Sequence, residues 1–405
     1  MLKQVKSLGA GLLIAQSFSI INQLIIGRFF MPESLGLYSL AIQLSAVVSL
    51  ILFFRREYFI VEIKSKIQAF YYINYSLLKG VKRLIPLFLL ALLINFYGKF
   101  FTIEVMIFSL LFGVLISYSI SLQQIFNMKR AFFKSGMSEA VQKISFFVCL
   151  LVFSLMTFKS SIINFISLSF FIAVLIRIIY SLYFLKELKI PKYKNRKKYY
   201  STFDEQTKKG FILSKNNGIA AITGLAPTLF IVNQFSSEDL GYFTMAITLL
   251  SLPTSLIGNS ISQVLYEHLS SFKENRNLKE IKRLSFILVS TSLTFLFLYI
   301  LGEKIIIGIA LGEKWRSSLE IIYILIPSFM VSYISKPFER SCYLLGKQNW
   351  HVISAILKLI LVMLAIFISF LTNSNFLFYV TAFSIATIIH YLIDFTYNYY
   401  LILKI

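Results

Sequence analysis

The sequence predicts an all-α integral membrane protein with twelve transmembrane helices in two six-helix lobes. Apolar residues make up 57% of the 405 positions and charged residues only 14%, whereas soluble domains contain about 45–50% and 25%. One sequence pattern occurs twice, at 30–42 and at 235–247. Lysine and arginine gather in every second loop between the apolar runs. These three observations together predict the fold class.

The expected spans follow from the length of the apolar runs. A helix that crosses the hydrocarbon core needs about 20 largely apolar residues. The first half of the chain then holds six spans, at 7–30, 36–60, 82–97, 102–126, 137–157 and 161–185. The second half holds six more, at 210–233, 238–265, 284–302, 317–340, 348–371 and 375–400. The first run is too long for a signal-peptide core, so we expect it to be retained.

The repeated pattern places one turn between the first two helices of each half. Phe, Glu, Leu, Gly, an aromatic residue, Ala and Ile recur in register, with Gly36 matched by Gly241. A chance match of two helix–turn–helix loops is the alternative to a true internal repeat. The repeat predicts lobes at 1–200 and 201–405, separated by a basic cytoplasmic linker at 186–209. Because six spans is an even number, we expect a pseudo-two-fold axis along the membrane normal.

Basic residues predict that both termini lie in the cytoplasm. The loops on that side are rich in lysine and arginine, at 64–83, 129–134, 186–209 and 273–283. The net charge of +22 is therefore explained by topology and anionic lipid headgroups, without nucleic acid. On the outer side, Gly302–Ser317 is amphipathic and carries Trp315, which is typical of a segment lying at the membrane interface.

Several kinds of chemistry have no counterpart in the sequence. The nucleotide-binding pattern G-x-x-x-x-G-K-[ST] and the zinc pattern H-E-x-x-H are both absent, and the three histidines are scattered. Cys149 and Cys342 lie within apolar runs and are expected to be core residues. The outer loops are too short to carry catalytic groups. We therefore expect no enzyme, no metal and no cofactor, which leaves a transporter or a membrane scaffold.

The first copy of the repeat resembles a known family. The segment Gly27-Arg28-Phe29-Phe30-Met31-Pro32-Glu33-Ser34-Leu35-Gly36-Leu37-Tyr38 is similar to the signature of Wzx-type O-antigen and polysaccharide flippases. These proteins belong to the multidrug/oligosaccharidyl-lipid/polysaccharide (MOP) exporter superfamily. In the second lobe, the stretches 238–243, 252–253 and 261–270 are similar as well. The sequence departs from the family pattern at Asn233-Gln234, and it lacks the proline that follows the position of Tyr266.

The resemblance implies a MATE-like fold and a lipid-linked cargo. The cargo would be an undecaprenyl-diphosphate-linked oligosaccharide, such as the repeat unit of the O-antigen of lipopolysaccharide, of a capsule or of an exopolysaccharide. It would move from the cytoplasmic to the outer leaflet of the bacterial inner membrane by alternating access of the two lobes. The resemblance also implies membrane lipids, a polysaccharide polymerase and a chain-length regulator as partners.

An anionic diphosphate requires cations inside the membrane, where each ionisable residue is a functional hypothesis. The candidate cations within or next to the spans are Arg55, Arg56, Lys143, Arg177, Lys215, Lys336, Arg340 and Lys358. Snorkelling to the headgroups is the alternative for those near helix ends, namely Arg55, Arg56, Lys215 and Arg340. Lys358 lies deepest and has no acidic residue three or four positions away. We therefore expect Lys358 to face a cavity and to contact the diphosphate.

His390 and Asp394 are one helical turn apart and share a helix face. Such a pair can bind and release a proton, which would couple transport to a gradient of H⁺ or Na⁺. A structural ion pair, or a position of Asp394 at the inner surface, is the alternative. Two other functions stay open: a drug or cation antiporter of the same fold, and a scaffold that transports nothing. Eight candidate cations outnumber the acidic residues near the spans, which favours the anionic cargo.

Overall fold

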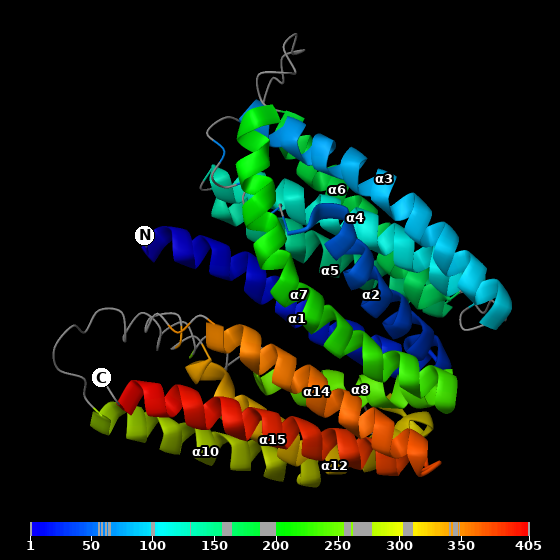
Figure 1. Cartoon of the computed structure of the whole chain (residues 1–405), viewed down its shortest axis with the longest axis vertical. Helices are drawn as coiled ribbons and strands as arrows, with labels where there is room; N and C mark the ends of the chain where they lie inside the picture. Colours follow the sequence, from blue (N-terminus) through cyan, green and yellow to red (C-terminus); the bar gives the residue numbers. More distant parts are fainter. Residues whose placement is uncertain are drawn as a thin grey trace. The chain divides into compact units, whose positions relative to one another are not determined.

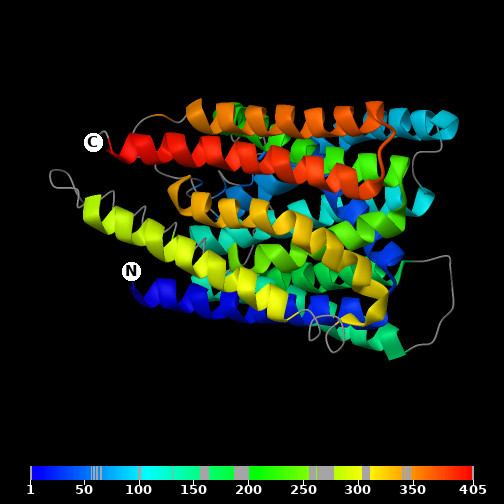
Figure 2. The same ribbon diagram turned by 90° about the horizontal axis from the view of Figure 1, so that it is seen from below.

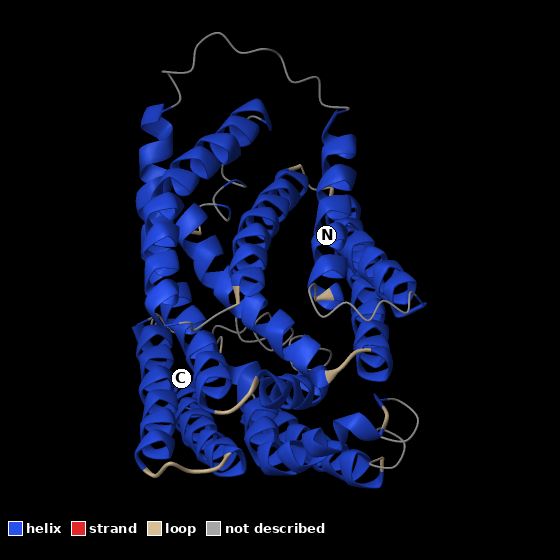
Figure 3. Ribbon diagram, turned by 90° about the vertical axis from the view of Figure 1, so that its right-hand side faces the viewer, coloured by secondary structure: helices blue, strands red, loops and turns tan. Residues whose placement is uncertain are grey.

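The computed structural model of the chain contains helices and connecting segments, with no strand in the part of the chain that it describes (Figure 3). The described residues are 2–55, 57, 60, 63, 66–98, 102–129, 131–155, 164–186, 200–254, 261, 278–302, 311–339, 342, 347 and 349–403. They form two compact units, Met1–Leu225 and Ala226–Ile405. The boundary lies within one long helix. The lobe boundary expected at residue 200 stays a prediction, since most of the basic linker lies outside the described residues.

The described residues of the first unit form six complete α-helices (Figure 1). They are α1 (Leu2–Phe29), α2 (Pro32–Phe53), α3 (Lys66–Gly98), α4 (Ile103–Met128), α5 (Phe132–Leu155) and α6 (Phe165–Lys186), and the unit ends in the first part of α7 (Tyr200–Gln234). Helix α5 packs between α1 and α6, while α2 packs against α4. Helix α4 also packs against α6.

The second unit repeats three of these pairings. It contains the end of α7, then α8 (Ser237–Pro253), α10 (Leu278–Leu301), η5 (Glu313–Trp315), α12 (Arg316–Ser335), η6 (Lys336–Phe338), α14 (Asn349–Leu371) and α15 (Phe376–Leu403). Helix α12 packs against α8, α10 and α15, and α15 also packs against α14. Figures 1 and 2 show α15 lying between α14 and α12. When the long helices of each half are counted in order, the pairs α2–α4, α4–α6 and α5–α6 correspond to α8–α12, α12–α15 and α14–α15.

The helix ends confirm the internal repeat. Helix α1 ends at Phe29 and α2 begins at Pro32, while α7 ends at Gln234 and α8 begins at Ser237. Both boundaries therefore shift by the same 205 residues that separate Gly36 from Gly241. Proline suits the first helical position of α2. In α8 the preceding Ser236 provides the cap instead, because its Oγ accepts the N–H of Asp239 at 3.0 Å.

The repeated aromatic residue has the same role in both units. Tyr38 on α2 packs edge-on against Phe170 on α6, with ring centroids 5.6 Å apart. Phe243 on α8 packs edge-on against Phe383 on α15, with centroids 5.5 Å apart. Each aromatic residue joins the second helix of its half to the sixth. The glycine two positions earlier is buried in both copies. The repeat is therefore present in the structure as well as in the sequence.

The lengths of the helices support a multi-pass membrane protein. Every expected span overlaps one helix of the described chain. Eight helices are long and apolar enough to cross a membrane, and α1 contributes a shorter apolar stretch, Leu13–Phe29. Helices α3, α7 and α8 do not meet that strict criterion within the described residues. Polar residues in α3 and α7 and the short described length of α8 account for the difference.

Two expectations need correction. The third span, expected at 82–97, belongs to a helix that begins sixteen residues earlier, at Lys66. Its additional turns are amphipathic: Ala69, Tyr72 and Ile73 are buried, but polar residues such as Gln68 and Asn74 lower the hydropathy. Trp315, expected at the membrane interface, is fully buried and packs edge-on against Tyr242 at 6.1 Å. Residues 303–310 of that segment, and the end of the eighth span beyond residue 254 apart from residue 261, lie outside the described residues.

Candidate functional site

Two polar stripes face each other between α14 and α15. On α14, Trp350, Ser354 and Lys358 recur every fourth position, and on α15, His390, Asp394 and Asn398 do the same. Residues four apart lie on one face of a helix. Because a short turn joins the two helices and they pack together, both stripes meet inside the second unit. The pair therefore forms a buried polar network in an otherwise apolar environment.

Asp394 is the centre of this network and is 6% exposed. Its Oδ1 accepts hydrogen bonds from Ser354 Oγ at 2.7 Å and from Trp350 Nε1 at 3.0 Å. Its Oδ2 accepts one from Asn398 Nδ2 at 3.2 Å. Within the described residues, no cationic nitrogen lies at ion-pair distance from the carboxylate. The neutral donors therefore hold Asp394, and the structural ion pair considered from the sequence is not formed there.

Ser354 connects Asp394 to His390. Its Oγ lies 3.1 Å from His390 Nε2. The serine hydroxyl has a single proton, which it gives to Asp394, so toward the histidine it must accept. His390 Nε2 therefore carries the proton in this arrangement. The Nδ1 atom of His390 is buried and has no hydrogen-bond partner in the described part of the chain. Asp394, Ser354 and His390 thus form a continuous hydrogen-bonded path.

Lys358 lies one turn from Ser354 on α14, about 14 Å from the start of the helix. Its ammonium donates to Tyr391 Oη at 3.1 Å and lies 4.9 Å from the centre of the Tyr391 ring. An ammonium has three donors, and the described residues accept one of them. The charge of Lys358 acts on Glu339, but the two are not at ion-pair distance among the described contacts.

Lys336 and Glu339 form an ion pair where α12 ends, with Nζ 2.6 Å from Oε2. His351 Nδ1 lies 3.8 Å from the other oxygen of Glu339. Lys336 was a candidate for binding the diphosphate, yet its ammonium already contacts a carboxylate. Glu339 is therefore shared between basic residues of η6 and α14, next to the network around Asp394.

Arg177 is the centre of a second polar network, in the first unit. Its Nη1 donates to Gln142 Oε1 and its Nη2 to Gln123 Oε1, both at 2.6 Å, while Nε donates to Ser138 Oγ at 3.2 Å. These acceptors come from α4 and α5, and Arg177 itself is on α6. The guanidinium is 6% exposed. All three nitrogens are engaged by neutral oxygens, so Arg177 ties three helices together.

Of the remaining candidate cations, the structure describes the side chains of two, Arg55 and Lys143. Arg55 follows the end of α2 and pairs with the buried Glu57, its Nη1 lying 3.4 Å from Oε1. Lys143 on α5 is half-buried, one turn after Glu139, whose charge acts on it. Arg56, Arg340 and the side chain of Lys215 lie outside the described residues.

The sequence analysis missed the neutral partners of these charges. Tyr391, Ser354 and Trp350 in the second unit are examples, as are the glutamines around Arg177. Polar residues repeated at every fourth position within an apolar run were the available indication, since that spacing marks one face of a helix. The pattern identifies the stripe, but only the packing of α14 against α15 identifies its partner.

Solved structures with the same architecture cover nearly the whole chain. The lipid II flippase MurJ, in an inward closed conformation, is 18% identical with a TM-score of 0.73, over 97% of this chain and 87% of that one. An inward-facing multidrug resistance MATE family transporter of the MOP superfamily is 11% identical with a TM-score of 0.64, over 95% and 94%. A MOP superfamily transporter from Pyrococcus furiosus is 13% identical with a TM-score of 0.58, over 98% and 95%.

These likenesses define the class: the chain has the all-helical fold of the MOP superfamily. Among proteins of curated function, none matches the sequence. Residues 63–320 match the polysaccharide biosynthesis protein family. That match spans more than half of the chain, so the protein belongs to this family.

Proposed function

We propose that the protein translocates a lipid-linked oligosaccharide across the bacterial inner membrane. The cargo is an undecaprenyl-diphosphate-linked repeat unit of an O-antigen, capsule or exopolysaccharide, moved from the cytoplasmic to the outer leaflet. Membership of a polysaccharide biosynthesis family and a fold similar to that of a lipid II flippase support this cargo class. The two lobes would alternate access to it, with both termini in the cytoplasm.

The observation that carries the proposal is the state of Lys358. An uncompensated charge near the bilayer centre costs about 2.5–3.5 kcal/mol on insertion scales. Lys358 donates to one neutral hydroxyl, that of Tyr391, and the described chain leaves two of its donors for another acceptor. A diphosphate oxygen provides a charged acceptor that strengthens such a hydrogen bond. Lys336, in contrast, is paired with Glu339 and is a weaker candidate.

The path from Asp394 through Ser354 to His390 supports coupling to an ion gradient. A buried carboxylate held by neutral donors can take up a proton without breaking an ion pair. His390 Nδ1 provides a second site for a proton in the same path. We propose that this network, on the helix pair that also carries Lys358, binds the coupling ion, H⁺ or Na⁺. A polymerase and a chain-length regulator would act on the translocated cargo.

The central experiment measures surface glycan and membrane protein level for variants of Lys358. Lys358→Ala should insert normally but abolish surface glycan, because the diphosphate loses its cation. Lys358→Arg should keep part of the export, since the charge remains. Lys347→Ala is the matched control: it makes the same change at an exposed lysine of the same region and should export normally. Normal export by Lys358→Ala would contradict the proposal.

The same variants separate the rival functions. An antiporter of cationic drugs needs carboxylates, so Asp394→Asn would abolish efflux while Lys358→Ala would not. A scaffold would tolerate both substitutions provided that the protein stays folded. Only the glycan transporter requires the cation of Lys358 for transport.

A further inference from the structure

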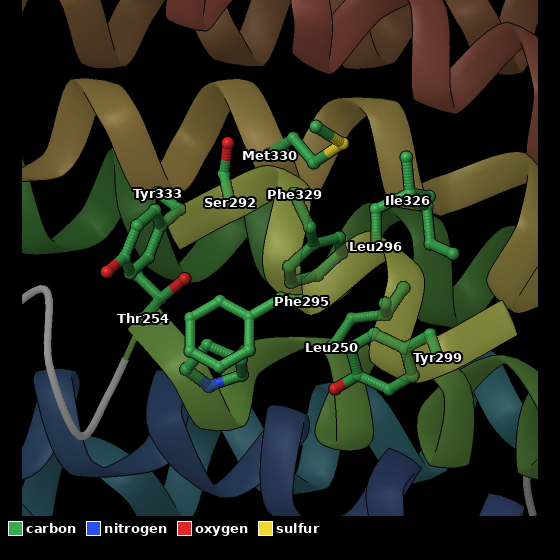
Figure 4. A pocket seen from close by; sticks show the side chains of 11 residues that line it. Leu250, Thr254, Ser292, Phe295, Leu296, Tyr299, Ile326, Phe329, Met330 and Tyr333 are labelled. Atoms are coloured by element: carbon green, nitrogen blue, oxygen red, sulfur yellow. The ribbon is translucent and has the colours of Figure 1, made fainter. Parts of the chain in front are cut away.

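The last turns of α12 have one aromatic face and one polar face. On the aromatic face, Tyr333 packs edge-on against Phe295 of α10 with ring centroids 5.8 Å apart, and both rings line the same hollow (Figure 4). On the polar face, Ser332 hydrogen-bonds Tyr391 of α15, the tyrosine that accepts from Lys358. The polar face of α12 therefore belongs to the surroundings of the Lys358 ammonium.

The short helix η6 continues α12 and carries the next two charges. Lys336 begins η6, and Glu339 follows directly after its end. Between them, Phe338 is fully buried and packs edge-on against Phe395 and Tyr399 of α15, with ring centroids 5.3 and 5.9 Å apart. This packing anchors the backbone, so the two charged side chains can exchange partners by rotation alone. In the proposed topology, η6 lies at the cytoplasmic end of its span, where the cargo loads.

Three basic residues interact with the carboxylate of Glu339. Lys336 Nζ lies 2.6 Å from Oε2, and His351 Nδ1 lies 3.8 Å from Oε1. The charge of Lys358 acts on the same carboxylate. The charges of both lysines also act on Tyr391. Two ammonium groups and one imidazole from η6 and α14 thus gather around a single acidic side chain.

A diphosphate would need the same basic groups that Glu339 occupies. The side chains of Lys336 and Glu339 are 40% and 29% exposed, so a ligand can reach both. Ion pairs at such partly exposed positions contribute little to stability, and opening this one therefore costs little free energy. Phosphate oxygens form the same charge-assisted hydrogen bonds with an ammonium as a carboxylate does. A diphosphate also carries more charge than one carboxylate, so it can replace Glu339 at Lys336.

We propose that Glu339 is an exchangeable counter-ion that the diphosphate of the cargo displaces. Without cargo, Glu339 pairs with Lys336, as in this structure. When the diphosphate arrives, Glu339 rotates away, and Lys336 joins Lys358 in binding the two phosphate groups. The return of Glu339 to Lys336 then helps to expel the diphosphate after translocation. The inference rests on the proposed function, since that function supplies the diphosphate.

The first measurement is the affinity of the full-length protein in nanodiscs for undecaprenyl diphosphate without glycan. A counter-ion that is in place most of the time lowers the apparent affinity by roughly three- to tenfold, because only the open fraction binds. Glu339→Gln keeps the size of the side chain but removes its charge, so it should bind more tightly by about that factor. Adding Lys336→Ala should cancel the gain. Glu313→Gln is the matched control: it removes the carboxylate from another pair three residues apart, with Arg316 Nη1 at 3.7 Å, and should bind as the wild type does.

The second measurement uses the wild type and needs no variant. A carbodiimide joins a lysine amine and a carboxylate that are in contact into an amide, and it takes up the water that is lost. Lys336 and Glu339 should therefore become linked, which mass spectrometry of their peptide detects. Undecaprenyl diphosphate should lower the yield of this link. Phosphatidylglycerol, whose headgroup carries a single charge, should leave the yield unchanged.

Four results would overturn the inference alone. They are equal or weaker binding by the folded Glu339→Gln variant, a gain that survives Lys336→Ala, a link yield that undecaprenyl diphosphate leaves unchanged, and a yield that both lipids lower equally. Thermal unfolding shows whether each variant is folded, and the link in the wild type decides if one is not. If neither the wild type nor Glu339→Gln binds undecaprenyl diphosphate, the proposed function fails together with the inference.

Discussion

Gly11 on α1 and Gly136 on α5 lie in direct backbone contact. A Cβ atom placed on Gly11 would lie 2.6 Å from the carbonyl carbon of Gly136, closer than side chains approach a backbone. Small residues allow transmembrane helices to pack this closely, which maximises van der Waals contact. We expect Gly11→Ala to push α1 away from α5 and to destabilise the protein by about 1–3 kcal/mol. Thermal unfolding in detergent measures the change.

Gly218 on α7 is the matched control for that prediction. A Cβ atom there would have its nearest neighbour, Leu50 Cδ2, at 3.4 Å, which is an ordinary contact. Alanine is more favourable than glycine inside a helix by about 0.5–1 kcal/mol. Gly218→Ala should therefore be neutral or stabilising. If both substitutions had the same effect, the close approach of α1 and α5 would not be the cause.

The effects of substitutions at Pro253 and Tyr299 on the free energy of unfolding should be coupled. Pro253, at the end of α8, has no N–H to donate to the carbonyl of Leu249 four positions earlier, and the Tyr299 hydroxyl donates to that oxygen instead. Tyr299→Phe leaves a buried carbonyl without its partner, which costs about 1–3 kcal/mol. In a Pro253→Ala background the main chain can supply the missing donor, so the loss should shrink. A double-mutant cycle of unfolding free energies measures the coupling; a zero coupling energy contradicts the account.

Substitution of Arg177 should lower the stability of the protein more than its transport activity. Lysine cannot reproduce the planar set of donors that bonds Gln142, Gln123 and Ser138. Arg177→Lys should therefore lower the thermal stability and the membrane level, while export per folded molecule stays close to that of the wild type. The conservative exchange in the other direction, Lys358→Arg, should leave stability unchanged. Normal stability combined with lost export in Arg177→Lys would instead place Arg177 among the cargo ligands.

Asp394 should determine the response to an ion gradient. In proteoliposomes, an imposed proton or sodium gradient should accelerate translocation by the wild type. Asp394→Asn keeps the size of the side chain but cannot take up a proton, so its rate should be the same with and without a gradient. Asp239→Asn makes the same chemical change at the start of α8, away from the network, and should respond as the wild type does. A gradient response that survives in Asp394→Asn would remove the network from coupling.

The sequence predicted most of the fold because a membrane imposes a simple rule. Each span needs a long apolar run, so the order and number of the helices follow from hydropathy alone. The turn at Gly36 and Gly241 was recognisable because it is repeated. The beginning of α3 was missed because polar residues such as Gln68 and Asn74 lie among its buried residues, Tyr72 and Ile73, and lower the mean hydropathy of the segment. Trp315 was misplaced because a tryptophan beside charged residues looks the same whether it is buried or at an interface.

The candidate site was predicted only in part. Charges such as Arg177 and Lys358 are conspicuous in an apolar run, so they were found. Their partners are neutral residues, and these occur throughout the chain. Whether Lys336 meets Glu339 or a ligand depends on side-chain geometry at the end of α12, and hydropathy contains no information about it. The contact of Ser354 with Asp394 depends on how α14 and α15 align across a turn, which requires the tertiary structure.

The equal spacing of the helix ends in the two halves points to the history of the chain. Boundaries that coincide after 205 residues, with the same buried glycine and the same aromatic anchor, are what duplication of a six-helix gene would leave. The ancestral product would have worked as a pair of identical subunits, each contributing the same helices. After fusion the halves were free to diverge: one acquired the Arg177 network on α4, α5 and α6, and the other acquired the Asp394 network on α14 and α15. The modern chain thus has one architecture used twice, with a different buried polar network in each half.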